Sequence, residues 1–245
     1  MLLQKIADKI RFSDEIYTIL LFGDSSLSTE WVNPSWRAII EYVIKNEVER
    51  LLNDWQKPYF QIRFINAGLN GGDTFQFLKL LPRDLKHFKP NLVVFMGGDN
   101  DIPVEIPFQI SIDNLNKIRK LLSDSVDQFI FSSGPKSLDE KHALENYRYL
   151  DSLSRQRLYS NEILLNLYDE FDSRKVDLNR IYTFKLSDED AKYAGLPTSS
   201  IDPYHPNRIG QSIIASVILE KAFGISFDPD LYLRTLDLGD KYPSY

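Results

Sequence analysis

The sequence predicts an α/β fold in which a parallel sheet lies between two layers of helices. Short apolar runs of the kind that form buried strands alternate along the chain with longer segments of helical periodicity. Three of these runs end directly in glycine-containing loops, and such loops meet at the carboxyl edge of a parallel sheet, where ligands bind. No repeat, low-complexity segment or linker interrupts the pattern, so we expect residues 1–245 to form one domain.

The first expected strand runs from Tyr17 to Phe22 and is apolar on both faces, which is typical of a central strand. The clearest helix follows Asn33 and Pro34, a capping residue and a proline suited to the first helical position. Its apolar positions recur at helical spacing and are Trp36, Ile39, Ile40, Val43, Ile44, Val48, Leu51 and Leu52.

An alternation of apolar and polar residues over 60–64 predicts a half-exposed strand at an edge of the sheet. A glycine-rich loop then leads into a helix that begins near Thr74. Pro82 is expected to end or kink this helix around Leu81, because proline removes a backbone donor and clashes with the preceding turn. The apolar run over 92–96 predicts another buried strand.

The second half of the chain continues the alternation of helices and strands with weaker signals. The expected elements are a helix over 112–122, a strand over 128–132, a loop and helix over 136–155, a helix through 163–171, a short strand within 175–184 and a helix over 209–218. The aromatic and acidic tail over 224–245 receives no assignment.

The composition narrows the classes of function. The net charge of -6 gives no electrostatic reason to expect a nucleic-acid partner or an acidic membrane surface. The absence of cysteine excludes disulfides, thiolate metal sites and a cysteine nucleophile. The first ten residues carry charges where a signal peptide is apolar, and no run is long enough to span a membrane. We therefore expect a soluble cytoplasmic protein, or a secreted one if a leader was removed.

The segment Gly23-Asp24-Ser25-Ser26 places a hydroxyl directly after the first strand. A serine hydroxyl is a weak nucleophile that needs an adjacent base, usually an imidazole held by a carboxylate. His87 and His142 lie among charged residues and are expected on solvated surfaces. His205 lies three residues after Asp202 and is flanked by prolines, so this carboxylate can reach the imidazole nitrogen that faces away from the serine.

Acyl transfer to the serine also needs hydrogen-bond donors for the developing oxyanion. Three groups are expected to serve: the backbone N–H of Ser25, a glycine N–H from the loop that contains Gly71, and the side-chain amide of Asn100. Glycine and asparagine are also ordinary turn residues, so neither is specific for this role when taken alone.

Taken together, four motifs resemble the conserved blocks of the SGNH hydrolase superfamily, also called GDSL esterases and lipases. They are Gly23-Asp24-Ser25, Asn66-Ala67-Gly68-Leu69-Asn70-Gly71, Gly98-Asp99-Asn100-Asp101 and Asp202-Pro203-Tyr204-His205-Pro206-Asn207. Each motif is short, but their order, their positions after expected strands and their span of nearly the whole chain make the combination specific.

The resemblance implies a flavodoxin-like three-layer α/β/α sandwich with a five-stranded parallel sheet in the order 2-1-3-4-5. It also implies Ser25 as the nucleophile, Asp202 and His205 as its acid and base, and Gly71 and Asn100 as oxyanion donors beside the Ser25 N–H.

Two details depart from the usual blocks. Ser26 duplicates the serine, and the spacing from Gly23 favours Ser25 as the nucleophile. The second block has a doubled glycine: counting from Asn66 favours Gly71, whereas counting back from Asp73 favours Gly72. We choose Gly71.

The predicted function is hydrolysis of carboxylic esters through an acyl-enzyme, with a small-molecule or carbohydrate ester as the partner. Short-chain or acetyl esters are favoured over long lipids because no long apolar lid is visible, and acyl selectivity is expected from residues 136–155 and 187–201. An O-acyltransferase and a non-catalytic binding domain of the same fold are the alternatives.

No cofactor or metal is expected, because acids beside glycine turns are usually caps; these acids are Asp24, Asp73, Asp99 and Asp101. The oligomeric state stays open.

Overall fold

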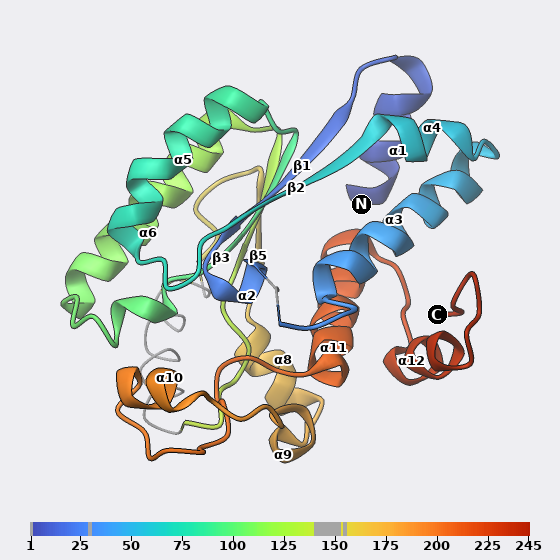
Figure 1. Ribbon diagram of the computed structural model, residues 1–245. Coiled ribbons are helices and arrows are strands. Elements are labelled where there is room, and N and C mark those ends of the chain that lie inside the picture. Colours follow the sequence, from blue (N-terminus) through green and yellow to red (C-terminus); the bar gives the residue numbers. More distant parts are fainter. Residues whose placement is uncertain (1, 29–30, 140–152, 154–155) are drawn as a thin grey trace.

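The computed structural model describes residues 2–28, 31–139, 153 and 156–245, and it contains a five-stranded parallel sheet (Figure 1). The strands are β1 (Tyr17–Gly23), β2 (Ile62–Gly68), β3 (Leu92–Met96), β4 (Gln128–Ser132) and β5 (Glu162–Leu165). They lie side by side in the order β2-β1-β3-β4-β5, and every neighbouring pair is parallel. The predicted fold class and strand order are confirmed.

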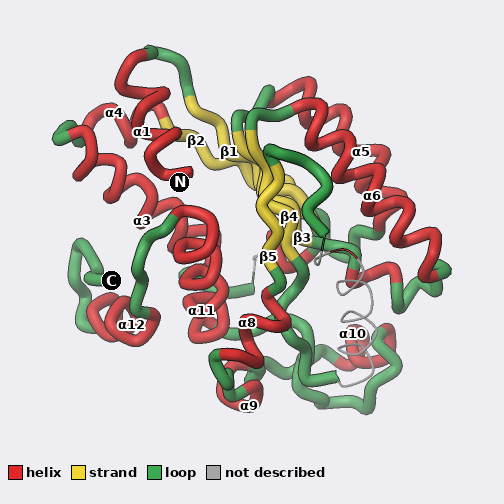
Figure 2. The backbone as a smooth tube through the Cα atoms, turned by 180° about the vertical axis from the view of Figure 1, so that it is seen from behind, coloured by secondary structure: helices red, strands yellow, loops and turns green. Residues whose placement is uncertain are grey.

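Helices cover both faces of the sheet (Figures 1 and 2). One layer contains α5 (Thr74–Phe88) and α6 (Phe108–Ser125), and the other contains α1 (Leu2–Phe12), α3 (Trp36–Leu52) and α11 (Arg208–Ile218). The shorter helical elements are α2 (Ser25–Ser28), α4 (Gln56–Gln61), η1 (Asp99–Asp101), α8 (Leu167–Ser173), α9 (Leu178–Ile181), α10 (Asp188–Tyr193), η2 (Leu219–Phe223) and α12 (Pro229–Asp237).

The alternation of side chains along β1 creates two hydrophobic cores. Ile19 and Leu21 point into the core shared with α1, α3 and α11, whereas Leu20 and Phe22 point into the core shared with α5 and α6. All seven residues of β1 are buried, as expected for a central strand. This burial on both faces fixes the end of β1 firmly between its neighbours β2 and β3.

Three details of the elements expected in the first half differ in the structure. Phe60 belongs to α4, whose N-terminus is capped by the Asp54 carboxylate, so the edge strand begins at Ile62 and continues to Gly68. Helix α5 passes through Pro82 and continues to Phe88, because a buried apolar face that includes Phe77 and Leu85 holds it to the sheet. The cap of α3 is Ser35 and not Asn33, since the Ser35 hydroxyl accepts a hydrogen bond from the Ala38 N–H.

The fifth strand lies earlier in the chain than expected. Ile163 and Leu164 are in β5, where they pair with β4, and only the residues from Leu167 onward form helix α8. The segment 175–184, where the strand was expected, contains the short helix α9 instead. Of the expected loop and helix over 136–155, residues 140–152 and 154–155 lie outside the described part.

Candidate active site

The serine at the end of β1 forms a continuous chain of hydrogen bonds with a histidine and an aspartate. Ser25 Oγ is 2.9 Å from His205 Nε2, although the two residues are 180 positions apart in sequence. His205 Nδ1 is 2.7 Å from Asp202 Oδ2. Because an ionised carboxylate only accepts hydrogen bonds, this contact places the imidazole proton on Nδ1 and leaves Nε2 to accept the Ser25 hydroxyl proton.

The position of Ser25 follows from the turn that ends β1. The Asp24 N–H donates to the Met96 carbonyl of the neighbouring strand at 3.1 Å, which ties the turn to the sheet. At Gly23 a Cβ atom would lie 1.7 Å from that same carbonyl oxygen, so only glycine allows the two strand ends to approach so closely. Ser25 is thereby held as the first residue of α2.

The turn that carries His205 is built around Asp202. One oxygen of this carboxylate accepts the N–H groups of Tyr204 at 2.8 Å and His205 at 3.1 Å, and the other oxygen faces the imidazole. Burial raises the pKa of Asp202, but the hydrogen bonds from His205 and from the backbone outweigh it and hold the pKa below its usual value. Asp202 therefore stays ionised and orients the imidazole at neutral pH.

The three expected oxyanion donors line the same cavity as Ser25 and His205, which has a volume of about 530 Å³. Within the described part of the chain, neither the Ser25 N–H nor the Gly71 N–H donates a hydrogen bond. The Gly72 N–H donates to the Leu69 carbonyl at 2.9 Å, which favours Gly71 over Gly72 as the free donor. Asn100 Nδ2 donates one of its two hydrogens to the Gly72 carbonyl at 3.1 Å.

A buried carboxylate ties the loops of Gly71 and Asn100 together. Asp101 is fully buried and accepts hydrogen bonds from the Thr74 N–H at 2.9 Å and from the Thr74 hydroxyl at 2.8 Å. Asn114 Nδ2 in turn donates to that hydroxyl at 3.1 Å. The contacts join the start of α5 to the turn after β3, and so hold the two loops in one arrangement.

The cavity contains an acidic pair that the sequence analysis did not assign to the site. Asp24 is 2% exposed, and its Oδ2 has no hydrogen-bond partner among the described residues. Burial raises the pKa of Asp24 to about 6. Burial, with the negative charges of Asp24 and Asp101, raises the pKa of Asp99 well above its usual range. Asp99 therefore keeps its proton to a higher pH than an exposed aspartate does.

We expect Asp99→Asn to stabilise the protein progressively as the pH rises. The unfolded chain releases the Asp99 proton near pH 4, whereas the folded chain keeps it to a higher pH, so wild-type stability falls with rising pH above that point. The substitution removes this loss and is expected to raise the free energy of unfolding by at least about 1 kcal/mol at pH 8, with little effect near pH 4. Urea unfolding across this pH range measures the difference.

The Asp14→Asn variant provides the control, because it makes the same chemical change at an exposed residue that does not line the cavity. A parallel gain in the Asp14 variant, or a gain in Asp99→Asn that does not depend on pH, would contradict the assignment of the proton to Asp99.

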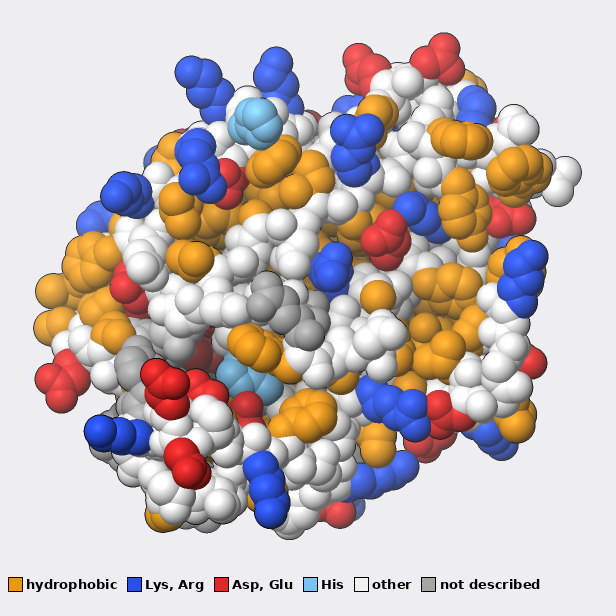
Figure 3. Space-filling view, viewed as in Figure 1, with side chains coloured by type: hydrophobic (Ala, Val, Ile, Leu, Met, Phe, Trp, Pro, Cys, Tyr) orange, Lys and Arg blue, Asp and Glu red, His pale blue; other side chains and the backbone are white. Residues whose placement is uncertain are grey.

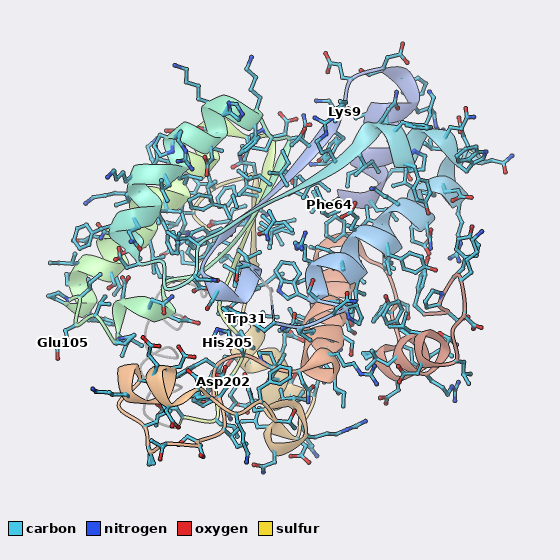
Figure 4. All side chains as sticks on the ribbon, in the orientation of Figure 1. Lys9, Trp31, Phe64, Glu105, Asp202 and His205 are labelled. Atoms are coloured by element: carbon cyan, nitrogen blue, oxygen red, sulfur yellow. The ribbon has the colours of Figure 1, made fainter. Side chains whose placement is uncertain are left out.

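An aromatic residue beside His205 was also missed. The ring centroid of Trp31 lies 5.5 Å from that of His205 with an angle of 48° between the planes, and the labels of these two residues adjoin that of Asp202 in Figure 4. Phe184 and Tyr204 line the same cavity. The one sequence signal for Trp31 as a site residue is its position in the loop that follows Ser25. By contrast, His87 is exposed on α5, as expected, and His142 lies outside the described residues.

The segment 187–201, expected to control acyl selectivity, contributes Ser187, Asp190 and Ala194 to the cavity wall. Of the other expected segment, 136–155, Ser137 lines the cavity, and residues 140–152 and 154–155 are outside the described part. None of the described helices is long and apolar enough to cross a membrane. The described histidines and acids include no group of three or more arranged to hold a metal ion.

The fold and the hydrogen-bonded serine, histidine and aspartate at its sheet edge define an α/β protein of the esterase and acylhydrolase class. Residues 19–218 match the family model of the GDSL-like lipases and acylhydrolases. The chain belongs to this family, and it is a GDSL-type carboxylic ester hydrolase.

Solved structures with the same fold have low sequence identity to the chain. A G-D-S-L family lipolytic protein from Veillonella parvula is 17% identical, with a TM-score of 0.62 and coverage of 85% of this chain and 100% of that one. A catalytic mutant of the acetylxylan esterase Axe2 from Geobacillus stearothermophilus is 15% identical, with a TM-score of 0.58 and coverage of 84% and 94%. No curated protein has a significantly similar sequence.

Proposed function

We propose that the protein hydrolyses uncharged esters of short acyl groups, acetylated carbohydrates above all, through an acyl-enzyme on Ser25. The observation that carries this proposal is the unbroken chain of hydrogen bonds from Ser25 Oγ through His205 to Asp202. In the reaction, His205 Nε2 takes the hydroxyl proton while Oγ forms a bond to the ester carbonyl carbon. The carbonyl oxygen becomes an oxyanion, which the N–H groups of Ser25 and Gly71 and the Asn100 amide stabilise.

The tetrahedral intermediate on Ser25 then breaks down to the acyl-enzyme and the alcohol. The bond between the carbonyl carbon and the alcohol oxygen breaks, and His205 Nε2 donates its proton to that oxygen, so a neutral alcohol leaves. Water attacks the acyl-enzyme, gives one proton to His205, and releases the carboxylic acid as the Ser25 hydroxyl is restored. Asp202 remains ionised throughout and stabilises the imidazolium that forms in each half of the cycle.

Two observations support the substrate class. The cavity is lined by four aspartates against one lysine, Lys185, and this lining is net negative even with a proton on Asp99, so a negatively charged acyl or alcohol part is disfavoured. The aspartates are Asp24, Asp99, Asp190 and Asp202. In addition, the structural neighbours include acetylxylan and acetyl-xylooligosaccharide esterases, which supports a short acyl group and a carbohydrate alcohol.

The test is a panel of nitrophenyl esters from acetate to palmitate, together with succinate monoester as the anionic counterpart of butyrate. We expect the highest kcat/KM for acetate, a steady fall with chain length, and at least about a tenfold preference for butyrate over succinate. A fluorophosphonate probe should add one label, located on the peptide that contains Ser25. Preference for palmitate, or acyl transfer to an added sugar without hydrolysis, would contradict the proposal.

A further inference from the structure

The catalytic cavity shares a wall with a second cavity. Trp31 and Phe184 line both the space of about 530 Å³ that contains Ser25 and His205 and an adjoining space of about 370 Å³. The second space is completed by Val32, Asn33, Asn207, Arg208 and Ile209. An acetyl group occupies only a small part of the first cavity, so most of both spaces is open to the alcohol part of an ester.

Trp31 is placed to contact a ligand as well as His205. Its side chain is 50% exposed, even though it makes a ring contact with the imidazole. Figure 3 shows a pale-blue histidine side chain next to hydrophobic side chains in the lower centre of the molecule, the region where Figure 4 labels Trp31 and His205. A large apolar ring left half open inside a cavity is typical of a binding surface.

The chemistry of ester cleavage decides which part of the substrate meets this ring. His205 must donate a proton to the departing alcohol oxygen, so the alcohol part lies on the His205 side of Ser25. The acyl oxygen lies toward the free donors of Ser25 and Gly71 and the Asn100 amide. Trp31 contacts His205, and it therefore borders the alcohol part and not the acyl group.

Hydrogen bonds within the protein hold the polar side chains of the second cavity in place, and an ion pair neutralises the charge of Arg208. The Arg208 guanidinium forms two hydrogen bonds to the Asp237 carboxylate, at 2.8 and 2.7 Å. Asn207 caps α11 through a hydrogen bond from the Ile209 N–H and donates to the Thr183 hydroxyl. A ligand in this space thus meets two aromatic rings and a polar but neutralised surface, which suits an uncharged molecule with apolar faces and hydroxyl edges.

We propose that Trp31 and Phe184 form an alcohol-side subsite for a sugar ring, and that an oligosaccharide chain continues from it into the second cavity. The inference rests on the proposed esterase function and names its substrate as an acetylated oligosaccharide. A pyranose ring presents a face of C–H groups that packs on an aromatic face, while its hydroxyl groups remain at the edges in contact with amides and water.

The test compares substrates that share the acetyl group and differ in the alcohol: nitrophenyl acetate, acetylated methyl xyloside, and acetylated xylobiose and xylotriose. For the wild type we expect kcat/KM to rise about tenfold from the monosaccharide to the trisaccharide ester. Trp31→Ala is expected to abolish this rise, chiefly through a higher KM, and to lose more on the trisaccharide than on nitrophenyl acetate. Trp55→Ala is the matched control, because Trp55 is 59% exposed and lines neither cavity.

Binding of unacetylated xylotriose gives a second readout that does not require turnover. Of the three tryptophans, Trp31 alone lines the two cavities, whereas Trp36 is fully buried, so direct contact with the ligand changes the emission of Trp31. We expect the change to persist in Trp55→Ala and to disappear in Trp31→Ala.

The possible failures are distinguishable. If the wild type leaves nitrophenyl acetate and every sugar ester uncleaved, the proposed function fails and the subsite proposal fails with it. If the wild type cleaves nitrophenyl acetate but shows no gain with chain length, or if Trp31→Ala keeps the gain, the esterase proposal stands and the subsite proposal is overturned.

Discussion

Ser25→Ala is expected to lower kcat for nitrophenyl acetate by about 10⁴-fold or more, to a rate close to that of the buffer. The substitution removes the oxygen atom that we propose as the nucleophile, while the imidazole, its carboxylate and the backbone donors remain. Because substrate contacts elsewhere in the cavity are retained, KM should change little for any residual activity. Steady-state release of nitrophenol measures both constants, and the fluorophosphonate label should be lost in the same variant.

Ser26→Ala is the matched control for this prediction. Ser26 is adjacent in sequence, but its N–H is directed to Asp24 Oδ1 at 2.9 Å, whereas the His205 imidazole contacts the Ser25 hydroxyl. We expect Ser26→Ala to lose less than about tenfold in kcat and to keep the phosphonate label. The reverse pattern, with Ser26→Ala inactive and Ser25→Ala active, would move the nucleophile by one residue and contradict the assignment.

The parts of the fold that were predictable from sequence are those where local and global signals agree. β1 is an apolar run that ends at a glycine, and the same residues are buried on both faces in the centre of the sheet. The turn residues after β1 and β3, together with the Asp202–His205 spacing, predicted a candidate site whose residues the structure brings together, because parallel strands end at one edge.

The errors occurred where a short apolar run fits two structures. Ile163 and Leu164 lie at helical spacing from Leu167 and Phe171, yet β5 is only four residues long and is selected by pairing with β4. A buried ion pair also holds β5: Arg119 Nε on α6 is 2.6 Å from the Glu162 carboxylate. Contacts of this kind join residues 43 positions apart, and periodicity within one segment does not contain them.

The sequence predicted where the candidate site lies better than it predicted which side chains surround it. Trp31 lies outside the four motifs, and Asp99 lies within one but received no role from it. Both residues were noticed only through the residues that the fold brings beside them. Trp31 meets a histidine from the far end of the chain. Burial raises the pKa of Asp99, and the charge of Asp24 from another strand end adds to this effect. These contacts join residues far apart in sequence, whereas the proposed nucleophile and base are visible as short motifs.

Asn100→Ala is expected to lower kcat by about 10²- to 10³-fold and to leave KM nearly unchanged. One amide hydrogen of Asn100 is held by the Gly72 carbonyl at 3.1 Å, which orients the group and leaves its second hydrogen for the oxyanion. The negative charge on that oxygen develops mainly in the transition state, so the lost hydrogen bond affects kcat more than substrate binding. Initial rates with nitrophenyl acetate over a range of concentrations separate the two constants.

Thr74→Val distinguishes a lost donor from a loosened loop. The Thr74 hydroxyl joins the loops of Gly71 and Asn100 through Asp101, and valine removes this 2.8 Å hydrogen bond while all three oxyanion donors are kept. We expect Thr74→Val to lose about 1–3 kcal/mol of stability, because Asp101 is buried, but less than about tenfold in kcat. An equal fall in kcat for the two variants would assign Asn100 a structural role, and a rise in KM alone for Asn100→Ala would place its amide in ground-state binding.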